Sequence, residues 1–146
     1  MTGHSMPRAD FYLIAKPRFL DDPLLLVCEL AKRCFGTGKG TLILTRDAAQ
    51  ADLIDGRLWE FEDDAFVPHQ IAGMDDEDGD CPVLIVSPEV EVPDRALIIN
   101  LRDAAFHGTC ERVLEVVPAD PAARAPLRER WRNYKARGFT MFKHDM

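Results

Sequence analysis

The sequence predicts an α/β fold in three layers, with a mostly parallel sheet flanked by helices. Three observations predict it. The 146 residues, 47% of them hydrophobic, suit one compact domain with a buried core. The first half of the chain holds two successive pairs of an apolar strand and an amphipathic helix. The second half holds three short, mostly continuously apolar runs, which are typical of strands buried on both faces.

The first strand is expected at residues 10–15 (DFYLIA), before a helix that Asp22 and Pro23 open and Gly36 ends. Residues 41–45 (TLILT) form the second expected strand, and Asp47 caps the helix after it. The apolar positions of both helices recur at helical spacing. They are Leu24, Val27, Cys28, Ala31 and Phe35 in the first helix and Ala51, Ile54 and Leu58 in the second, where Trp59 is a further candidate.

Three further strands are expected at residues 82–87 (PVLIVS), 96–101 (ALIINL) and 113–117 (VLEVV). Asp120 and Pro121 then open the last helix, which Gly138 ends. Pro126 lies too deep for a proline of the first turn, so this helix either kinks or begins there. The whole arrangement is Rossmann-like. We expect residues 1–8 to be a flexible segment and residues 9–146 to form the single domain.

Composition limits the possible functions. Apolar runs of about 20 residues, as a membrane span needs, do not occur. The four cysteines show no C-x-x-C spacing and no secretory pattern opens the chain, so a cytoplasmic location is expected. The net charge of -7 is unevenly placed, because residues 121–143 hold seven basic and one acidic residue. We therefore expect a local site for an acidic partner and no broad wrapping of DNA.

The remaining motifs do not indicate catalysis or metal binding. Residues 36–41 (GTGKGT) follow a helix and enter a strand, whereas a phosphate-binding loop follows a strand and opens a helix. A helix-to-strand turn is the better interpretation. The acidic residues 74–80 lack the calcium-binding pattern, and the four histidines lack ligand spacing. No nucleophile or carboxylate motif is present, so we expect neither cofactor nor metal.

Two segments remain as candidate binding sites. Residues 58–69 (LWEFEDDAFVPH) combine aromatic, acidic and proline residues, as exposed interface anchors do, although a loop pinned to the core fits equally well. Residues 128–138 (RERWRNYKARG) place Leu127, Trp131 and Tyr134 along one stripe of the last helix beside a basic face. Such a pattern usually belongs to a helix that packs its stripe on the sheet and exposes its charges.

These segments carry a resemblance to a known family. FYLI, VCELA, LWEF, FVPH, PVLI, LIINL, EVV and RERWRNYKARGF occur in an order similar to the chi subunit of bacterial DNA polymerase III. FVPH and RERWR with the later GF are the most specific elements. Trp131 and Arg132 depart from the tyrosine and lysine that also occur in the family, but both keep the chemical type.

The resemblance implies a Rossmann-like protein without a nucleotide site, which performs no chemistry and joins two partners. One partner is the psi subunit, through which chi joins the clamp loader. The other is the acidic C-terminal tail of single-stranded-DNA-binding protein, so that DNA is contacted only indirectly. By matching position, the residues for the tail are Arg124, Arg128, Trp131 and Arg132, with Val117 and Phe139 as apolar walls, and those for psi are Trp59, Phe66, Pro68 and His69.

The residues of the last helix also suit the tail chemically. A tail of acidic residues, an aromatic ring and a free carboxylate needs a ring pocket and a guanidinium fork. Two rival hypotheses remain open at this point. One is a nucleotide-utilising α/β enzyme, and the other is a protein that binds single-stranded DNA directly through its last helix.

Overall fold

The computed structural model describes residues 7–61, 67–74 and 78–146. These residues form one seven-stranded sheet in which all pairings are parallel, in the order β3-β4-β2-β5-β6-β1-β7. The strands are β1 (Arg8–Leu13), β2 (Thr41–Leu44), β3 (His69–Ile71), β4 (Val83–Val86), β5 (Leu97–Asn100), β6 (Arg112–Val117) and β7 (Thr140–Asp145).

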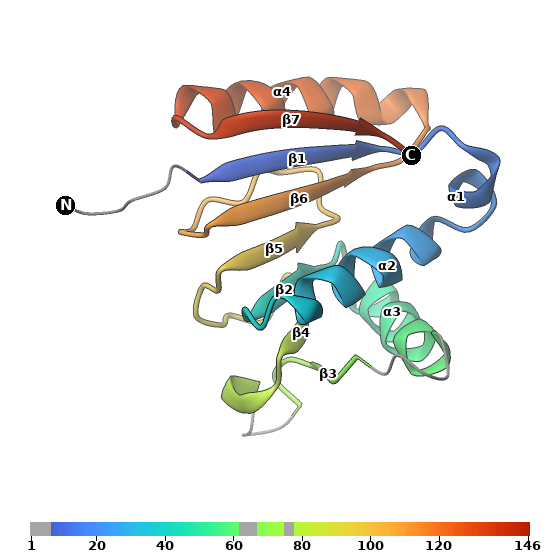
Figure 1. The fold of residues 1–146 in the computed structure, drawn as a ribbon, viewed down its shortest axis with the longest axis vertical. Coiled ribbons are helices and arrows are strands. Elements are labelled where there is room, and N and C mark those ends of the chain that lie inside the picture. Colours follow the sequence, from blue (N-terminus) through green and yellow to red (C-terminus); the bar gives the residue numbers. More distant parts are fainter. Residues whose placement is uncertain (1–6, 62–66, 75–77) are drawn as a thin grey trace.

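Helices cover both faces of this sheet. They are α1 (Pro17–Asp21), α2 (Pro23–Gly36), α3 (Ala48–Glu60) and α4 (Arg124–Ala136), with 3-10 turns at Asp78–Asp80 and Pro121–Ala123. Figure 1 shows α4 running along β7 and β1, apart from α2 and α3. The three-layer α/β fold expected from the sequence is confirmed. None of the described helices is long and apolar enough to span a bilayer.

Each face of the sheet has its own hydrophobic core. Ile43, Ile85 and Ile99 pack with buried residues of α2 and α3, whereas Leu42 and Ile98 pack with Tyr134 of α4. Alternate residues of one strand therefore enter different cores, as the two-residue period of a strand requires. This explains why β2, β4 and β5 are buried throughout and apolar at every position except Thr41 and Asn100.

The cap of α3 was predicted correctly, and α2 begins at Pro23 as expected but without a capping hydrogen bond. Asp47 accepts a hydrogen bond from the backbone N–H of Gln50, as a helix cap should. Asp22 occupies the cap position of α2 but makes no capping bond. Its carboxylate instead accepts two hydrogen bonds from the guanidinium of Arg57, at 2.7 and 2.6 Å, and so joins α2 to α3.

The prediction for Pro126 was wrong. Residues Pro121–Ala123 form a 3-10 turn, and the α-helix begins only at Arg124. Pro126 therefore lies in the first turn of α4, where backbone N–H groups have no partner within the helix and a proline removes no hydrogen bond. The α-helix thus begins two residues before Pro126, and Pro126 belongs to its first turn.

Three elements were not expected from the sequence: the short helix α1 and the two edge strands, β3 and β7. The last strand matters most for function. Buried Asp10 accepts hydrogen bonds from Arg8 and Arg112 and lies 2.7 Å from Nε2 of His144 on β7. Burial alone would raise the pKa of Asp10, but these hydrogen bonds outweigh burial and lower it. Long-range contacts therefore hold β7 against β1.

The glycine-rich stretch is a helix-to-strand turn, as predicted. It leaves α2 at Gly36 and enters β2 at Thr41, and Gly38 adopts a positive φ of 77°. Nζ of Lys39 lies 2.7 Å from Oε1 of Glu111, in the segment that precedes β6.

Candidate functional site

A hollow of about 320 Å³ opens between α4 and the strands beneath it. We call it the α4–β7 groove. Two strands and one helix build it, because β7 pairs with β1, and α4 packs on β7 and contacts Phe11 of β1 through Trp131. Its lining residues are Phe11, Leu13, Leu127, Arg128, Trp131, Arg132 and Lys143. The groove thus contains three of the residues expected to hold an acidic tail.

Aromatic side chains contribute to the apolar wall of the groove. The rings of Phe11 and Trp131 lie 5.1 Å apart between centroids at 56°, and Phe11 meets Tyr134 edge to face at 6.0 Å. Trp131 is only partly buried, whereas Phe11 and Tyr134 are fully buried. A fixed ring pair beside an open space is suited to contact with an apolar or aromatic side chain of a ligand.

Three cations surround this apolar wall. Arg128 and Arg132 lie one helical turn apart on α4, and Lys143 lies on β7, where it pairs in register with Phe11. All three side chains are exposed. Within the described part of the chain, none of them forms a hydrogen bond or an ion pair. Their charges are therefore available to an anionic ligand.

The other residues expected at the tail site lie elsewhere. Arg124 is exposed in the first turn of α4 but does not line the groove. Val117 and Phe139 are buried in the core beneath α4. Phe11, Leu13, Leu127 and Lys143 take their place in the lining. Lys143 lies two residues after Met141, so both share one face of β7. This spacing indicates Lys143 as a lining residue only once residues 140–145 are known to form a strand beside β1.

A buried ion pair fixes α4 on the sheet. Arg130 is 4% exposed, and its Nε lies 2.8 Å from Oε1 of the fully buried Glu115 on β6, without the geometry of a hydrogen bond. Oε2 of Glu115 accepts hydrogen bonds from Tyr134 of α4 and Asn100 of β5. These contacts hold the helix that carries Arg128, Trp131 and Arg132. Sequence reasoning counted Arg130 only as part of the basic segment.

Burial raises the pKa of Glu115 to about 7 from its usual 4.5, although Arg130, Tyr134 and Asn100 act in the opposite direction. Because the pKa of Glu115 is higher in the folded than in the unfolded chain, this group stabilises the fold fully at pH values below its usual pKa of 4.5. That stabilisation is lost as pH rises through about 7.

We expect the free energy of unfolding of the wild type, relative to Glu115→Gln, to fall by on the order of 3 kcal/mol from pH 5 to pH 8. Urea denaturation of both proteins across this range measures the difference. A constant difference would contradict the expectation.

A second candidate surface lies at the other end of the sheet. Trp59, at the end of α3, is 63% exposed and meets the ring of His69 edge to face at 5.3 Å. Pro68 lines a shallow hollow with both of them. The side chain of His69 is buried, with Nδ1 2.7 Å from the carbonyl oxygen of Val67. His69 therefore supports Trp59 from beneath. Phe66, the fourth residue expected here, lies outside the described residues.

Comparison with known proteins gives the family. The family model of the DNA polymerase III chi subunit, HolC, matches residues 6–142. The chain belongs to the DNA polymerase III chi subunit family. It is 35% identical to the subunit chi of Pseudomonas aeruginosa over 146 residues, which cover 97% of this chain and 98% of the relative. It is 33% identical to that of Escherichia coli over 142 residues, or 93% and 96% of the two chains.

Solved structures share the fold of this chi family member. The C-terminal domain of the DEAD-box protein Dbp5 matches 96% of this chain and 90% of that domain with a TM-score of 0.58 at 13% identity. T4 UvsW matches with a TM-score of 0.64 at 9% identity, and this chain spans 41% of its length. At such low identity the likeness concerns the fold alone. The chi subunit is thus a DNA replication protein of the polymerase III assembly, built on a widespread α/β fold.

Proposed function

We propose that this chi subunit is a non-catalytic adaptor. Through the α4–β7 groove it binds the acidic C-terminal tail of single-stranded-DNA-binding protein, and through the surface around Trp59 it binds the psi subunit of the clamp loader. The observation that carries the proposal is the combination of Arg128, Arg132 and Lys143, which have no partner in the described part of the chain, with a partly buried tryptophan. As a replication factor, the protein would act in the cytoplasm.

The groove provides each group that the tail requires. The guanidinium groups of Arg128 and Arg132 can each donate paired hydrogen bonds to a carboxylate, while Lys143 provides a point charge on the opposite wall. The wall of Phe11 and Trp131 can contact the aromatic ring of the tail. Because the cations are exposed, each pair contributes about 1 kcal/mol or less, so we expect modest and salt-sensitive affinity.

The groove also explains why contact with DNA would be indirect. Its positive charge is confined to one helix and one strand, while the net charge of the chain is -7. A duplex or a long single strand would bring phosphates against the acidic remainder of the surface. A short acidic peptide would contact only the groove and its cations, Arg128, Arg132 and Lys143.

One set of titrations separates the proposal from its rivals. The purified chain is titrated by fluorescence anisotropy with a labelled acidic tail peptide, a labelled single-stranded oligonucleotide and a labelled ATP analogue. Saturable binding of the peptide alone supports the adaptor. Tighter binding of the oligonucleotide than of the peptide would favour a direct DNA-binding protein, and saturable binding of the nucleotide analogue would favour an enzyme.

The surface around Trp59 is suited to an apolar partner. A large aromatic side chain that is mostly exposed, yet fixed by contact with a buried histidine, is typical of an interface anchor. Pro68 extends the same surface. It lies beyond β4 and β3, at the edge of the sheet opposite β7, so the two proposed partners would not compete (Figure 1).

Trp59→Ala should weaken binding to the psi subunit by about 2 kcal/mol or more, because interface tryptophans are frequent hot spots. The free energy of unfolding should change by less than about 1 kcal/mol, since most of the side chain already contacts solvent. Calorimetry with purified psi and urea denaturation measure the two quantities. Unchanged psi affinity in a folded variant would remove Trp59 from the interface, and tail-peptide affinity serves as the internal control.

A further inference from the structure

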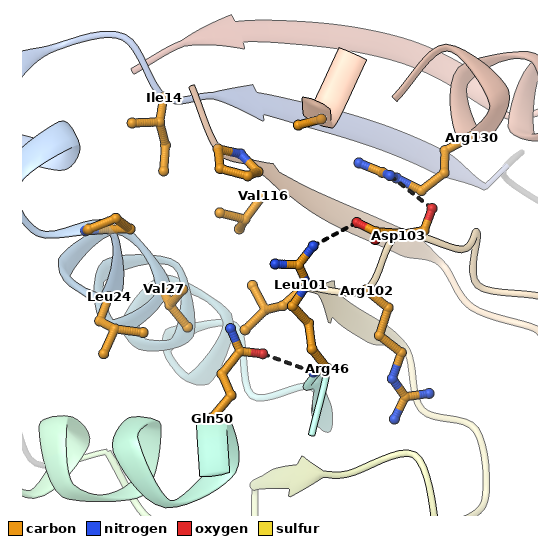
Figure 2. Close-up of a pocket in the computed structure, with 13 residues that line it drawn as sticks. Ile14, Leu24, Val27, Arg46, Gln50, Leu101, Arg102, Asp103, Val116 and Arg130 are labelled. Carbon is orange, nitrogen blue, oxygen red and sulfur yellow. Dashed lines mark hydrogen bonds and ion pairs between the residues drawn. The ribbon is translucent and has the colours of Figure 1, made fainter. Parts of the chain in front are cut away.

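A separate cavity of about 210 Å³ lies beyond the carboxyl ends of β1, β2, β5 and β6. Figure 2 shows it between the start of α2 and the segments that follow β2 and β5. One side is apolar and is formed by Leu24, Val27, Leu101 and Val116. None of its lining residues is shared with the α4–β7 groove.

The position of this cavity in the sheet is significant. After β2 the chain passes through α3 to β3 at one edge, whereas after β5 it passes to β6 in the opposite direction. Because β2 and β5 are neighbours, their following segments diverge and leave a crevice between them. In open α/β sheets such a switch point, outside the carboxyl ends of the strands, is where ligands bind.

The other side of the cavity is polar and centres on Asp103. Figure 2 shows arginines approaching this residue from two directions. Nη2 of Arg46 donates to the carboxylate of Asp103 at 2.8 Å, and Nη1 of Arg130 donates to its carbonyl oxygen at 2.9 Å. Nη2 of Arg130 donates no hydrogen bond to any residue that the structure describes. This buried arginine therefore has a free donor at the cavity.

The residues that line the cavity carry more positive than negative charge. Arg102 also lines it and donates from Nε and Nη2 to the carbonyl oxygens of Thr45 and Val86. It forms no ion pair within residues 7–61, 67–74 and 78–146. The cavity lining thus holds three guanidinium groups and one carboxylate, that of Asp103. Glu115 pairs with Arg130 at 2.8 Å and the charge of Glu89 attracts Arg102, but neither of these carboxylates lines the cavity. An anion in the cavity would therefore meet mainly positive charge in a partly desolvated setting.

We propose that this cavity binds a small molecule in which one anionic group, a carboxylate or a phosphate, is attached to a short apolar body. The anionic group lies against Arg46 and Arg130, and the apolar body contacts Leu24, Val27 and Val116. The volume of 210 Å³ is below the roughly 300 to 1,000 Å³ of pockets for drug-sized ligands, so the body has only a few carbon atoms.

Three probes with the same branched body test the proposal: isovalerate, isopentyl phosphate and the neutral isoamyl alcohol. Each is titrated into the 15N-labelled full chain while backbone amide shifts are followed. We expect saturable shifts at Arg46, Leu101 and Asp103 with at least one anion, and the tighter of the two identifies the anionic group. Equal affinity for the alcohol, shifts confined to other regions, or no saturable shift with either anion would each overturn the proposal.

Variants of Arg46 test the charge directly. Arg46 is half exposed and outside the core, so its replacement should leave the fold intact. Arg46→Gln should weaken the better anion roughly fivefold, while Arg46→Lys should recover part of that loss. Arg33→Gln, on α2 and outside this cavity, is the control and should change nothing. Affinity for the acidic tail peptide should stay at the wild-type value in Arg46→Gln, which separates failure of this proposal from failure of the adaptor function. An unchanged anion affinity in Arg46→Gln would overturn the proposed contact.

Discussion

Arg128→Glu should abolish measurable binding of the acidic tail peptide. The substitution removes a charge-assisted hydrogen bond of roughly 1.5 to 3 kcal/mol and adds repulsion against several carboxylates. Arg128 is exposed and forms no bond within the described part of the chain, so the free energy of unfolding should change by no more than about 0.5 kcal/mol. Calorimetry with a synthetic tail peptide, at low and at moderate salt, measures the effect. Arg132→Glu should behave in the same way.

Two further variants define where the site ends. Arg33→Glu makes the same change in net charge on α2, across the sheet from α4, and should keep wild-type affinity. Lys143→Glu should weaken binding, because Lys143 lines the groove from β7. Wild-type affinity in both Arg128→Glu and Arg132→Glu would contradict the tail site, and an affinity that does not depend on salt would independently exclude a cationic contact.

Arg130→Met should lower the free energy of unfolding by about 3 kcal/mol. Arg130 forms a buried ion pair with Glu115, and the loss of one partner leaves an uncompensated charge in the interior. It also removes the hydrogen bond to the carbonyl oxygen of Asp103. Urea denaturation at pH 8, where the Glu115 carboxyl is above its pKa of about 7, measures the largest effect.

The double variant Arg130→Met with Glu115→Gln provides the control. Without a carboxylate to leave unpaired, it should be more stable than Arg130→Met alone at pH 8. A loss of less than about 0.5 kcal/mol in Arg130→Met would show that the ion pair does not fix α4 on the sheet. Equal stability of the single and double variants would show that the unpaired charge is not the cause.

Local patterns predicted the centre of the fold, and long-range contacts decided its edges. β2, β4 and β5 are almost entirely apolar because both of their faces are buried, so their sequences alone identify them. β7 (TMFKHD) is mostly exposed and has no such pattern. Its place depends on its parallel pairing with β1 and on contacts such as that between His144 and Asp10, 134 residues apart in sequence. No local pattern contains that information.

The same distinction applies to the candidate site. Arg128 and Arg132 were predictable because the spacing of four residues places them on one face of a helix. Lys143, Phe11 and Leu13 were not, because the groove exists only where β7 pairs with β1. The family resemblance predicted Val117 and Phe139 as apolar walls of the tail site, but the structure places both side chains in the core beneath α4.

Binding of an acidic peptide tail in the α4–β7 groove can be followed residue by residue. The measurement is a titration of the 15N-labelled chain with the synthetic tail peptide, in which each backbone amide and the indole N–H of Trp131 are followed. We predict that the saturable shifts centre on Arg128, Trp131, Arg132 and Lys143, and that the amides around Trp59 stay unchanged. Shifts centred on the Trp59 surface or on the cavity around Asp103, with the indole of Trp131 unmoved, would contradict binding of the tail in the α4–β7 groove.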